Sequence, residues 1–189
     1  MNWNDHYRLR GQHAIFSPSS PSWLRYDEDK IRSFLEANEA RLLGTKLHDC
    51  ACQSITLGRQ QPKRNADSVS MYINDAIKYR MTPELCLYFS QCCFGHADAV
   101  SFDRGTLRIF DLKTGSLPGK MEQLMIYDAL FCHEYGYDPS EIKHDLRIYQ
   151  YNDINSMTPD PDDISEIMDQ IIRVDEVCAA REELRYEHT

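Results

Sequence analysis

The sequence predicts an α/β fold, in which a mixed sheet is flanked by helices, and three observations support it. Between residues 28 and 77, apolar residues recur at three- and four-residue spacing, which is typical of amphipathic helices. Residues 84–113 then change to the two-residue alternation of strands. A helix, a strand and a final helix follow, so that strands and helices alternate in the second half of the chain.

The individual elements can be placed by their residue ranges. Helices are expected at 28–43, 46–57, 69–77 and 121–135, and from Asp160-Pro161 onward. Strands are expected at 84–90, 94–102, 106–113 and 144–151. Gly44-Thr45 is expected to break the first helical stretch and to cap the second, and Gly136 to stop the helix before it. Pro161 suits the first position of the last helix.

Length and composition indicate one globular domain. The chain has 189 residues, of which 42% are apolar and 27% charged, as in ordinary folded domains. We divide it into an N-terminal segment and helix (1–43), a core (44–151) and an acidic C-terminal helix (152–189). The sequence contains no run of about 18 apolar residues, the length needed to span a membrane. Its first residues lack the pattern of a secretory signal. A cytoplasmic protein without a membrane partner is expected.

The cysteines argue against a disulfide framework or a structural zinc site. There are seven, an odd number, and none of them forms a C-x-x-C pair. Reduced thiols in a reducing compartment are therefore expected.

The net charge of −9 is unevenly distributed along the chain. Residues 152–189 hold 11 acidic and 3 basic side chains, a balance of −8, and residues 1–151 hold 19 and 18, a balance of −1. A local basic groove is therefore compatible with this charge distribution. Nonspecific binding of DNA over a broad, positively charged surface is not compatible with it.

The segment around residues 95–115 carries the chemistry. If Arg104-Gly105 is the two-residue turn of a hairpin, residues whose numbers sum to 209 face each other, and Asp98 lies opposite Asp111. The pairs Val100–Ile109 and Phe102–Leu107 would lie on the same face. Lys113 would project from that face as well.

Two opposed carboxylates are costly without a counter-charge. At about 4 Å they repel by about 4 kcal/mol at an effective dielectric near 20. A hard divalent cation such as Mg²⁺ or Mn²⁺ would remove this repulsion, and the Lys113 amine could then stabilise charge on a phosphate. The structural alternative is a hairpin whose end splays into water and leaves the acids solvated.

Two further features are weaker when taken alone. Gln123 and Tyr127 lie one helical turn apart and share a face, but Tyr could pack in the core with Gln at its rim. His48 shares a helical face with Cys52 and Ile55, where a histidine is either a core residue or a metal ligand.

Taken together, these motifs resemble the RecB-like branch of the PD-(D/E)XK nuclease superfamily, which includes small phage exonucleases and the exonucleases of CRISPR adaptation. The branch's pattern is a helix-borne His, Gly-x-x-Asp, (Asp/Glu)-x-Lys-x-Gly and Gln-x-x-x-Tyr, in that order. Here the four motifs are His48, Gly95-His-Ala-Asp98, Asp111-Leu-Lys113-Thr-Gly115 and Gln123-Leu-Met-Ile-Tyr127. The resemblance covers residues 44–127, and the segments starting at His13 and Leu146 resemble the phage members.

The resemblance implies a restriction-endonuclease-like core and a Mg²⁺- or Mn²⁺-dependent deoxyribonuclease, an exonuclease of phage DNA recombination, replication or processing in the host cytoplasm. It implies that the metal is held by His48, Asp98, Asp111 and the backbone carbonyl of Leu112. Lys113 would be catalytic, with Gln123 and Tyr127 orienting it or the DNA backbone.

Partners and cofactors follow from the same comparison. Many relatives hold an iron–sulfur cluster on one early and three late cysteines, but only Cys178 follows Cys132 here, so no iron–sulfur cluster is expected. DNA is the expected partner, together with a recombination or replication protein or a second copy of the chain. The basic residues expected to contact DNA phosphates are Lys63, Arg64, Lys120 and Arg147.

Two other classes of function stay open at this point. The chain could be a catalytically silent nuclease fold that binds a DNA end or a protein partner. It could also be a metal phosphohydrolase that acts on nucleotides rather than on polymers. Cleavage of linear DNA with Mn²⁺ separates the first class from a nuclease, and product analysis on free nucleotides separates the second.

Overall fold

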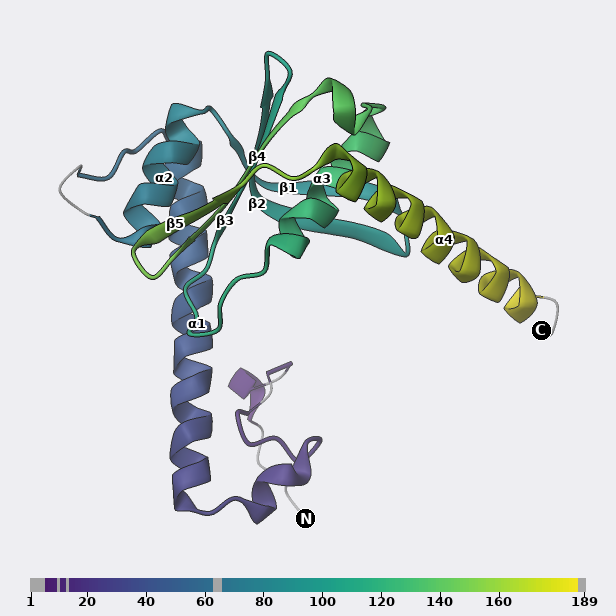
Figure 1. Ribbon diagram of the computed structural model, residues 1–189. Helices are drawn as coiled ribbons and strands as arrows, with labels where there is room; N and C mark the ends of the chain where they lie inside the picture. Colours follow the sequence, from purple (N-terminus) through teal and green to yellow (C-terminus); the bar gives the residue numbers. More distant parts are fainter. Residues whose placement is uncertain (1–5, 10, 13, 63–65, 187–189) are drawn as a thin grey trace. The chain divides into compact units, whose positions relative to one another are not determined.

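A five-stranded mixed sheet with helices on both of its faces forms the centre of the fold (Figure 1). The computed structural model describes residues 6–9, 11–12, 14–62 and 66–186. The strands lie in the order of the sequence: β1 (Thr82–Ser90), β2 (Cys93–Asp103), β3 (Thr106–Leu112), β4 (Lys143–Gln150) and β5 (Asp153–Met157). Neighbours are antiparallel except β3 and β4, which are parallel because α3 (Met121–Tyr135) crosses between them. The expected α/β fold with a mixed sheet is confirmed.

The chain divides into two compact units, Met1–Thr45 and Lys46–Thr189. In the first unit, two short 3₁₀ helices, Tyr7–Leu9 and Pro21–Arg25, precede the long helix α1 (Glu28–Thr56). Aromatic rings pack together in the first unit. The centroid of the Phe16 ring lies 6.1 Å from that of Trp23 and 5.5 Å from that of Phe34. The second unit holds the sheet, the end of α1, and the helices α2 (Ser68–Lys78), α3 and α4 (Pro161–Tyr186).

The predicted break at Gly44-Thr45 is wrong, because α1 is one continuous helix. A glycine inside a helix costs only about 1 kcal/mol, which the neighbouring turns can tolerate. Thr45 does not cap a new helix, since its hydroxyl donates back to the carbonyl of Arg41 at 3.2 Å. A threonine in this arrangement satisfies its hydroxyl within the helix that it would otherwise interrupt.

The other predicted elements are present, and one strand was not predicted. Helices α2 and α3 occupy the expected segments, and α3 ends at Gly136 in the left-handed conformation (φ 70°). The unpredicted strand is β5, which follows a tight turn at Tyr151 and Asn152 with φ of 55° and 58°. It is five residues long and mostly exposed, so its sequence shows little alternation.

Two apolar clusters hold the helices on the sheet. The cluster on one face joins β2, β3 and β4 to α3 and α4 through residues such as Val100, Leu124 and Ile164. The cluster on the other face joins the sheet to α2 and the end of α1 through residues such as Ile73 and Phe110. Because helices cover both faces of the sheet, the second halves of β3 and β4, residues 109–112 and 148–150, are buried without interruption.

A buried ion pair lies within the first of these clusters. The imidazole of His144 is 2% exposed, and its Nδ1 lies 2.7 Å from Oδ2 of Asp128, whose side chain is 0% exposed. Its Nε2 lies 2.9 Å from the carbonyl oxygen of Pro139. Both ring nitrogens therefore face acceptors and donate, which is the arrangement of a charged imidazolium. Burial lowers the pKa of His144, but the hydrogen bond to Asp128, the charge of Asp128 and the Pro139 carbonyl together outweigh burial, and the net pKa is raised.

We expect Asp128→Asn to destabilise the protein by about 3–5 kcal/mol, because it leaves a buried imidazolium unpaired. The pair also predicts a pH dependence. A raised histidine pKa contributes stability that is complete below the unfolded value, about 6.5, and is lost as the pH rises through the folded value. Denaturant unfolding from pH 7 upward should show this decline in the wild-type protein and not in Asp128→Asn.

A matched control for this experiment is Glu176→Gln, which neutralises an exposed acid on α4. It should keep both the stability and the pH profile of the wild-type protein. Parallel profiles for the wild-type protein and Asp128→Asn would contradict the assignment of a charged pair.

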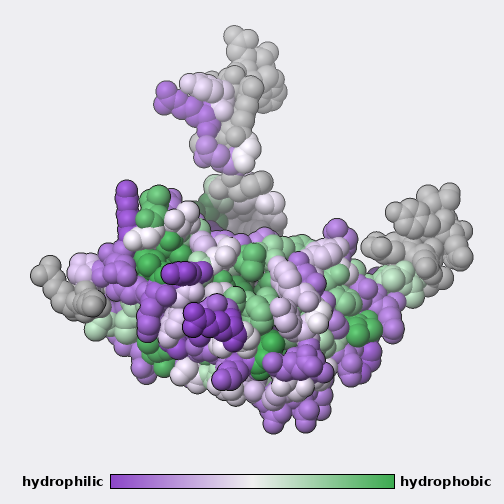
Figure 2. All heavy atoms as spheres, turned by 90° about the horizontal axis from the view of Figure 1, so that it is seen from above, coloured by the Kyte–Doolittle hydropathy of each residue, from purple (hydrophilic) through white to green (hydrophobic). Residues whose placement is uncertain are grey.

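Within the described part of the chain, no helix is long and apolar enough to cross a membrane. Figure 2 views the second unit from the end of the sheet that carries the β2–β3 turn and the C-terminal end of α2. Hydrophilic side chains cover most of this face, with apolar residues scattered among them.

Candidate metal centre and its lysine

The β2–β3 hairpin has the predicted register. Asp103 pairs with Thr106 around the Arg104-Gly105 turn, where both residues have positive φ (50° and 73°), as a type I′ turn requires. The pairs Val100–Ile109 and Phe102–Leu107 lie directly opposite each other. The ladder of paired residues ends at the pair of Ala99 with Phe110, and Asp98 and Asp111 follow at this inner end. Their side chains are 17% and 4% exposed, so the alternative in which the acids are solvated is wrong.

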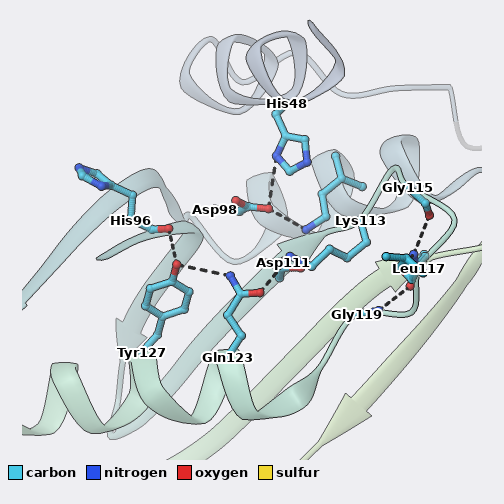
Figure 3. A network of polar contacts seen from close by, with 12 residues as sticks. His48, His96, Asp98, Asp111, Lys113, Gly115, Leu117, Gly119, Gln123 and Tyr127 are labelled. Carbon is cyan, nitrogen blue, oxygen red and sulfur yellow. Dashed lines mark hydrogen bonds and ion pairs between the residues drawn. The ribbon is translucent and has the colours of Figure 1, made fainter. Parts of the chain in front are cut away.

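Asp98 is held between the sheet and α1. Its Oδ2 accepts a hydrogen bond from the backbone N–H of Leu112 at 2.8 Å. Nδ1 of His48 lies 3.4 Å from the same oxygen. Figure 3 shows the imidazole pointing from α1 toward this carboxylate. His48 is therefore placed beside the acids and is not buried in the core, since its side chain remains 30% exposed.

Glu84, which was not predicted as a site residue, joins this pair. Ligand atoms of His48, Glu84 and Asp98 all lie within 4.8 Å of one another. Glu84 lies on β1 between the pairs Pro83–Ala99 and Leu85–Ala97, which places it opposite Asp98. Its φ is 52°, a strained value for a residue other than glycine, and such strain is concentrated at functional sites. A run such as Pro83-Glu84 at the start of a strand carries no signal that reveals this placement.

The pKa of Asp98 is raised because its carboxyl is buried next to other acids. Burial, followed by the charge of Asp111, raises its pKa to about 6, against the opposing effects of His48 and the Leu112 N–H. The stability that this raised pKa contributes to the metal-free protein is complete below about pH 4 and is lost as the pH rises through about 6. A bound cation would act in the opposite direction by favouring the charged carboxylate.

Asp111 is buried and faces Lys113. The Lys113 Nζ donates to Oδ1 at 3.1 Å and lies 3.0 Å from Oδ2. Oδ2 is buried and accepts no hydrogen bond. Asp111 lies outside the group of donor atoms formed by His48, Glu84 and Asp98. Of the three side chains expected to hold the metal, His48 and Asp98 therefore lie together, whereas Asp111 contacts Lys113.

A chain of hydrogen bonds from α3 holds the lysine. Lys113 donates to Oε1 of Gln123 at 3.0 Å, and Nε2 of Gln123 lies 3.4 Å from the hydroxyl of Tyr127. The Tyr127 hydroxyl donates to the carbonyl of His96 at 2.8 Å, which ties α3 to β2. Figure 3 shows this chain running from Tyr127 through Gln123 to Lys113. Gln123 and Tyr127 thus hold the lysine through hydrogen bonds, and the ring of Tyr127 also packs against the core, as the alternative expected.

Gly95, from the Gly-x-x-Asp motif, and Gly119, in the loop after Lys113, permit this geometry by close approach. A Cβ at Gly95 would lie 2.9 Å from Cε1 of Tyr127, and one at Gly119 would lie 3.0 Å from Cγ of Lys113. The loop after Lys113 is fastened by Gln150, which accepts from Gly119 N at 2.9 Å and donates to the carbonyls of Gly115 and Leu117 at 2.8 Å. This glutamine, near the end of β4, was not selected from the sequence.

The basic residues expected to contact DNA are placed differently from one another. Lys120 is exposed at the start of α3. Arg147 donates to both oxygens of Asp145 at 2.8 Å, so its guanidinium is already paired. Lys63 and Arg64, like His13, lie outside the described residues.

The chain was also compared with known proteins. No protein-family model matches it, and no curated protein matches it either.

Proposed function

We propose that the protein is a divalent-metal-dependent nuclease that hydrolyses phosphodiester bonds in DNA, with the site at the inner end of the β2–β3 hairpin. The observation that carries the proposal is the juxtaposition of a His48–Glu84–Asp98 group with a lysine fixed between Asp111 and Gln123. On this proposal the sheet and its helices are a core of the PD-(D/E)XK kind.

The side chains present suit a hard cation. Two carboxylates and one imidazole gather at one point, and carboxylate oxygens are the ligands that Mg²⁺ and Mn²⁺ prefer. A carboxylate oxygen of Asp111 is buried without a hydrogen bond, and the pKa of Asp98 is raised because its charge is poorly compensated. His48, Glu84 and Asp98 would hold the cation, with Asp111 and the Leu112 carbonyl as further donors. The cation would supply Lewis-acid activation of water and neutralise charge on the phosphate.

The remaining residues act on the substrate and on one another. The Lys113 side chain is 29% exposed, so it can be reached by a phosphate, while Asp111 and Gln123 fix the position of its ammonium. A fixed positive charge stabilises the negative charge that develops on the phosphate oxygens in the transition state. Gln123, held by Tyr127, gives the lysine a second acceptor beside Asp111.

The test is cleavage of labelled single-stranded and duplex DNA in Mg²⁺ or Mn²⁺ and in EDTA. We expect cleavage with either cation and none in EDTA, because the opposed acids are not neutralised without metal. Products should carry a 5′-phosphate and a 3′-hydroxyl. Full activity in EDTA would refute the proposal. Binding of DNA without cleavage would indicate the silent DNA-binding alternative, and release of phosphate from free nucleotides alone would indicate the phosphohydrolase.

A further inference from the structure

A basic hollow lies at the C-terminal end of α2 and the tip of the β2–β3 hairpin, apart from the metal centre. Its volume is about 670 Å³. We call it the Tyr79 pocket, and the side chains that matter in its lining are Lys78, Tyr79, Arg80, Ser101, Arg104 and Arg108. This end of the sheet faces the viewer in Figure 2, where hydrophilic side chains gather.

The Tyr79 pocket is positively charged in a chain whose net charge is −9. Four cationic side chains line it, against one acid, Asp103. Among the described residues, Lys78 and Arg80 form no ion pair. The contact of Arg104 with Asp103, at 3.9 Å, joins two exposed side chains and is weak. The pocket therefore favours an anion.

Two polar atoms on its floor lack partners. Ser101 and Arg108 lie directly opposite each other on β2 and β3. The Oγ of Ser101 and the Nε of Arg108 are both buried and make no hydrogen bond. The carboxylate of Asp145 is 3.6 Å from Nε, which is too far for a hydrogen bond. Buried polar atoms nearly always have a hydrogen-bond partner. Two neighbouring donors without one, in a positively charged pocket, therefore indicate a ligand that accepts hydrogen bonds.

The ring of Tyr79 holds the cations in place. The guanidinium carbon of Arg108 lies 4.6 Å from the ring centroid and the Nζ of Lys78 lies 4.8 Å from it, both within cation–π distance. A guanidinium stacked on a ring loses less freedom when it binds a phosphate than a free one does, and its planar fork matches phosphate oxygens. The site is therefore organised before any ligand arrives.

The Tyr79 pocket and the metal centre each include a residue of the edge strand β1. Thr82 lines the pocket, and Glu84, two residues further along β1, belongs to the His48–Glu84–Asp98 group. Two residues of a strand span about 7 Å, which is about two base steps of rise along one strand of duplex DNA. A nucleic acid strand at the metal centre would thus reach the pocket with a phosphate near the scissile one.

We propose that the Tyr79 pocket binds a backbone phosphate of the nucleic acid strand that occupies the metal centre, with Arg108 and Ser101 as hydrogen-bond donors and Lys78, Arg80 and Arg104 supplying charge. That the phosphate belongs to such a strand rests on the proposed function. The binding of a phosphate group in the pocket does not.

The experiment measures binding of a fluorescent oligonucleotide in EDTA across a range of KCl concentrations, so that no cleavage occurs. Arg108→Gln should weaken binding and lower the slope of log affinity against log salt by about one unit, the value for one lost phosphate contact. Arg80→Ala/Arg104→Ala changes only exposed side chains and should likewise lower the slope by about one unit, because the pocket holds one phosphate, which keeps the test valid if Arg108→Gln does not fold. Arg173→Ala, the matched control on α4, should change neither quantity.

Inorganic phosphate provides the second arm. It should displace the oligonucleotide from the wild-type protein more effectively than KCl at equal ionic strength, and this difference should shrink in Arg108→Gln. An unchanged salt slope in both pocket variants would overturn the proposal. So would a salt-sensitive dimer that Arg80→Ala/Arg104→Ala dissociates while DNA binding is unaltered, since an acidic segment of a second copy would then occupy the pocket. A protein that binds as expected but never cleaves DNA would refute the nuclease and leave the pocket standing.

Discussion

Asp111→Asn should abolish DNA cleavage, with a loss of at least about 10³-fold, and should weaken binding of Mn²⁺. The substitution keeps the shape of the side chain but removes a charge at the centre of the site, and groups that act as a unit in catalysis lose most of the activity when one of them is removed. A second effect is independent of activity. The pKa of Asp98 should fall below its value of about 6, because the charge of Asp111 is the largest cause of that raised pKa after burial.

The measurements are single-turnover cleavage, Mn²⁺ titration and the NMR titration of the Asp98 carboxyl. Asp153→Asn is the matched control, since it neutralises an exposed acid at the start of β5. It should leave all three quantities unchanged. Wild-type Mn²⁺ affinity in Asp111→Asn would show that the cation is held by His48, Glu84 and Asp98 without Asp111.

Lys113→Ala should lower the rate of the chemical step by about 10²–10³-fold while metal binding is retained, because it removes one positioned charge that stabilises the transition state. The acids remain in place, so the variant should still bind Mn²⁺. The Tm of the metal-free variant should fall, because the buried carboxylate of Asp111, 4% exposed, loses its cation, and Mn²⁺ should offset part of that loss. Lys143→Ala, which removes an exposed lysine at the start of β4, is the control and should cleave at the wild-type rate.

His48→Ala should fall between these two variants. It removes a metal donor from α1 but leaves the carboxylates, so higher Mn²⁺ concentrations should restore part of the activity. A lowered Tm with unchanged metal dependence would show that His48 only supports the packing of α1. Wild-type turnover in Lys113→Ala would remove the main reason for the nuclease proposal.

The sequence by itself determined those features that depend on local geometry. The Arg104-Gly105 turn sets the register of the β2–β3 hairpin, because a two-residue turn with positive φ admits only one pairing of the residues beside it. The opposed acids, Asp98 and Asp111, follow from that register. The spacing of Gln123 and Tyr127 likewise requires them to share a face of α3.

Only the tertiary structure decided where distant segments meet. A β-bulge between Tyr88 and Ser90 shifts the pairing of β1 with β2 by one residue, so that Glu84 and not Leu85 lies opposite Asp98. The composition of the β1–β2 hairpin does not reveal that bulge. The continuity of α1 through Gly44 also could not be predicted from the sequence. The low helix propensity of one glycine costs about 1 kcal/mol, which the turns on either side of it outweigh.

The Tyr79 pocket depends on tertiary structure in the same way. Its cations come from the end of α2 and from two strands, and their nearness follows from the packing of α2 on the sheet. A sequence indicates which residues share a face of one element, since that is set by the period of the backbone. Which faces come together depends on how the elements pack, and that is settled by contacts between residues far apart in the chain.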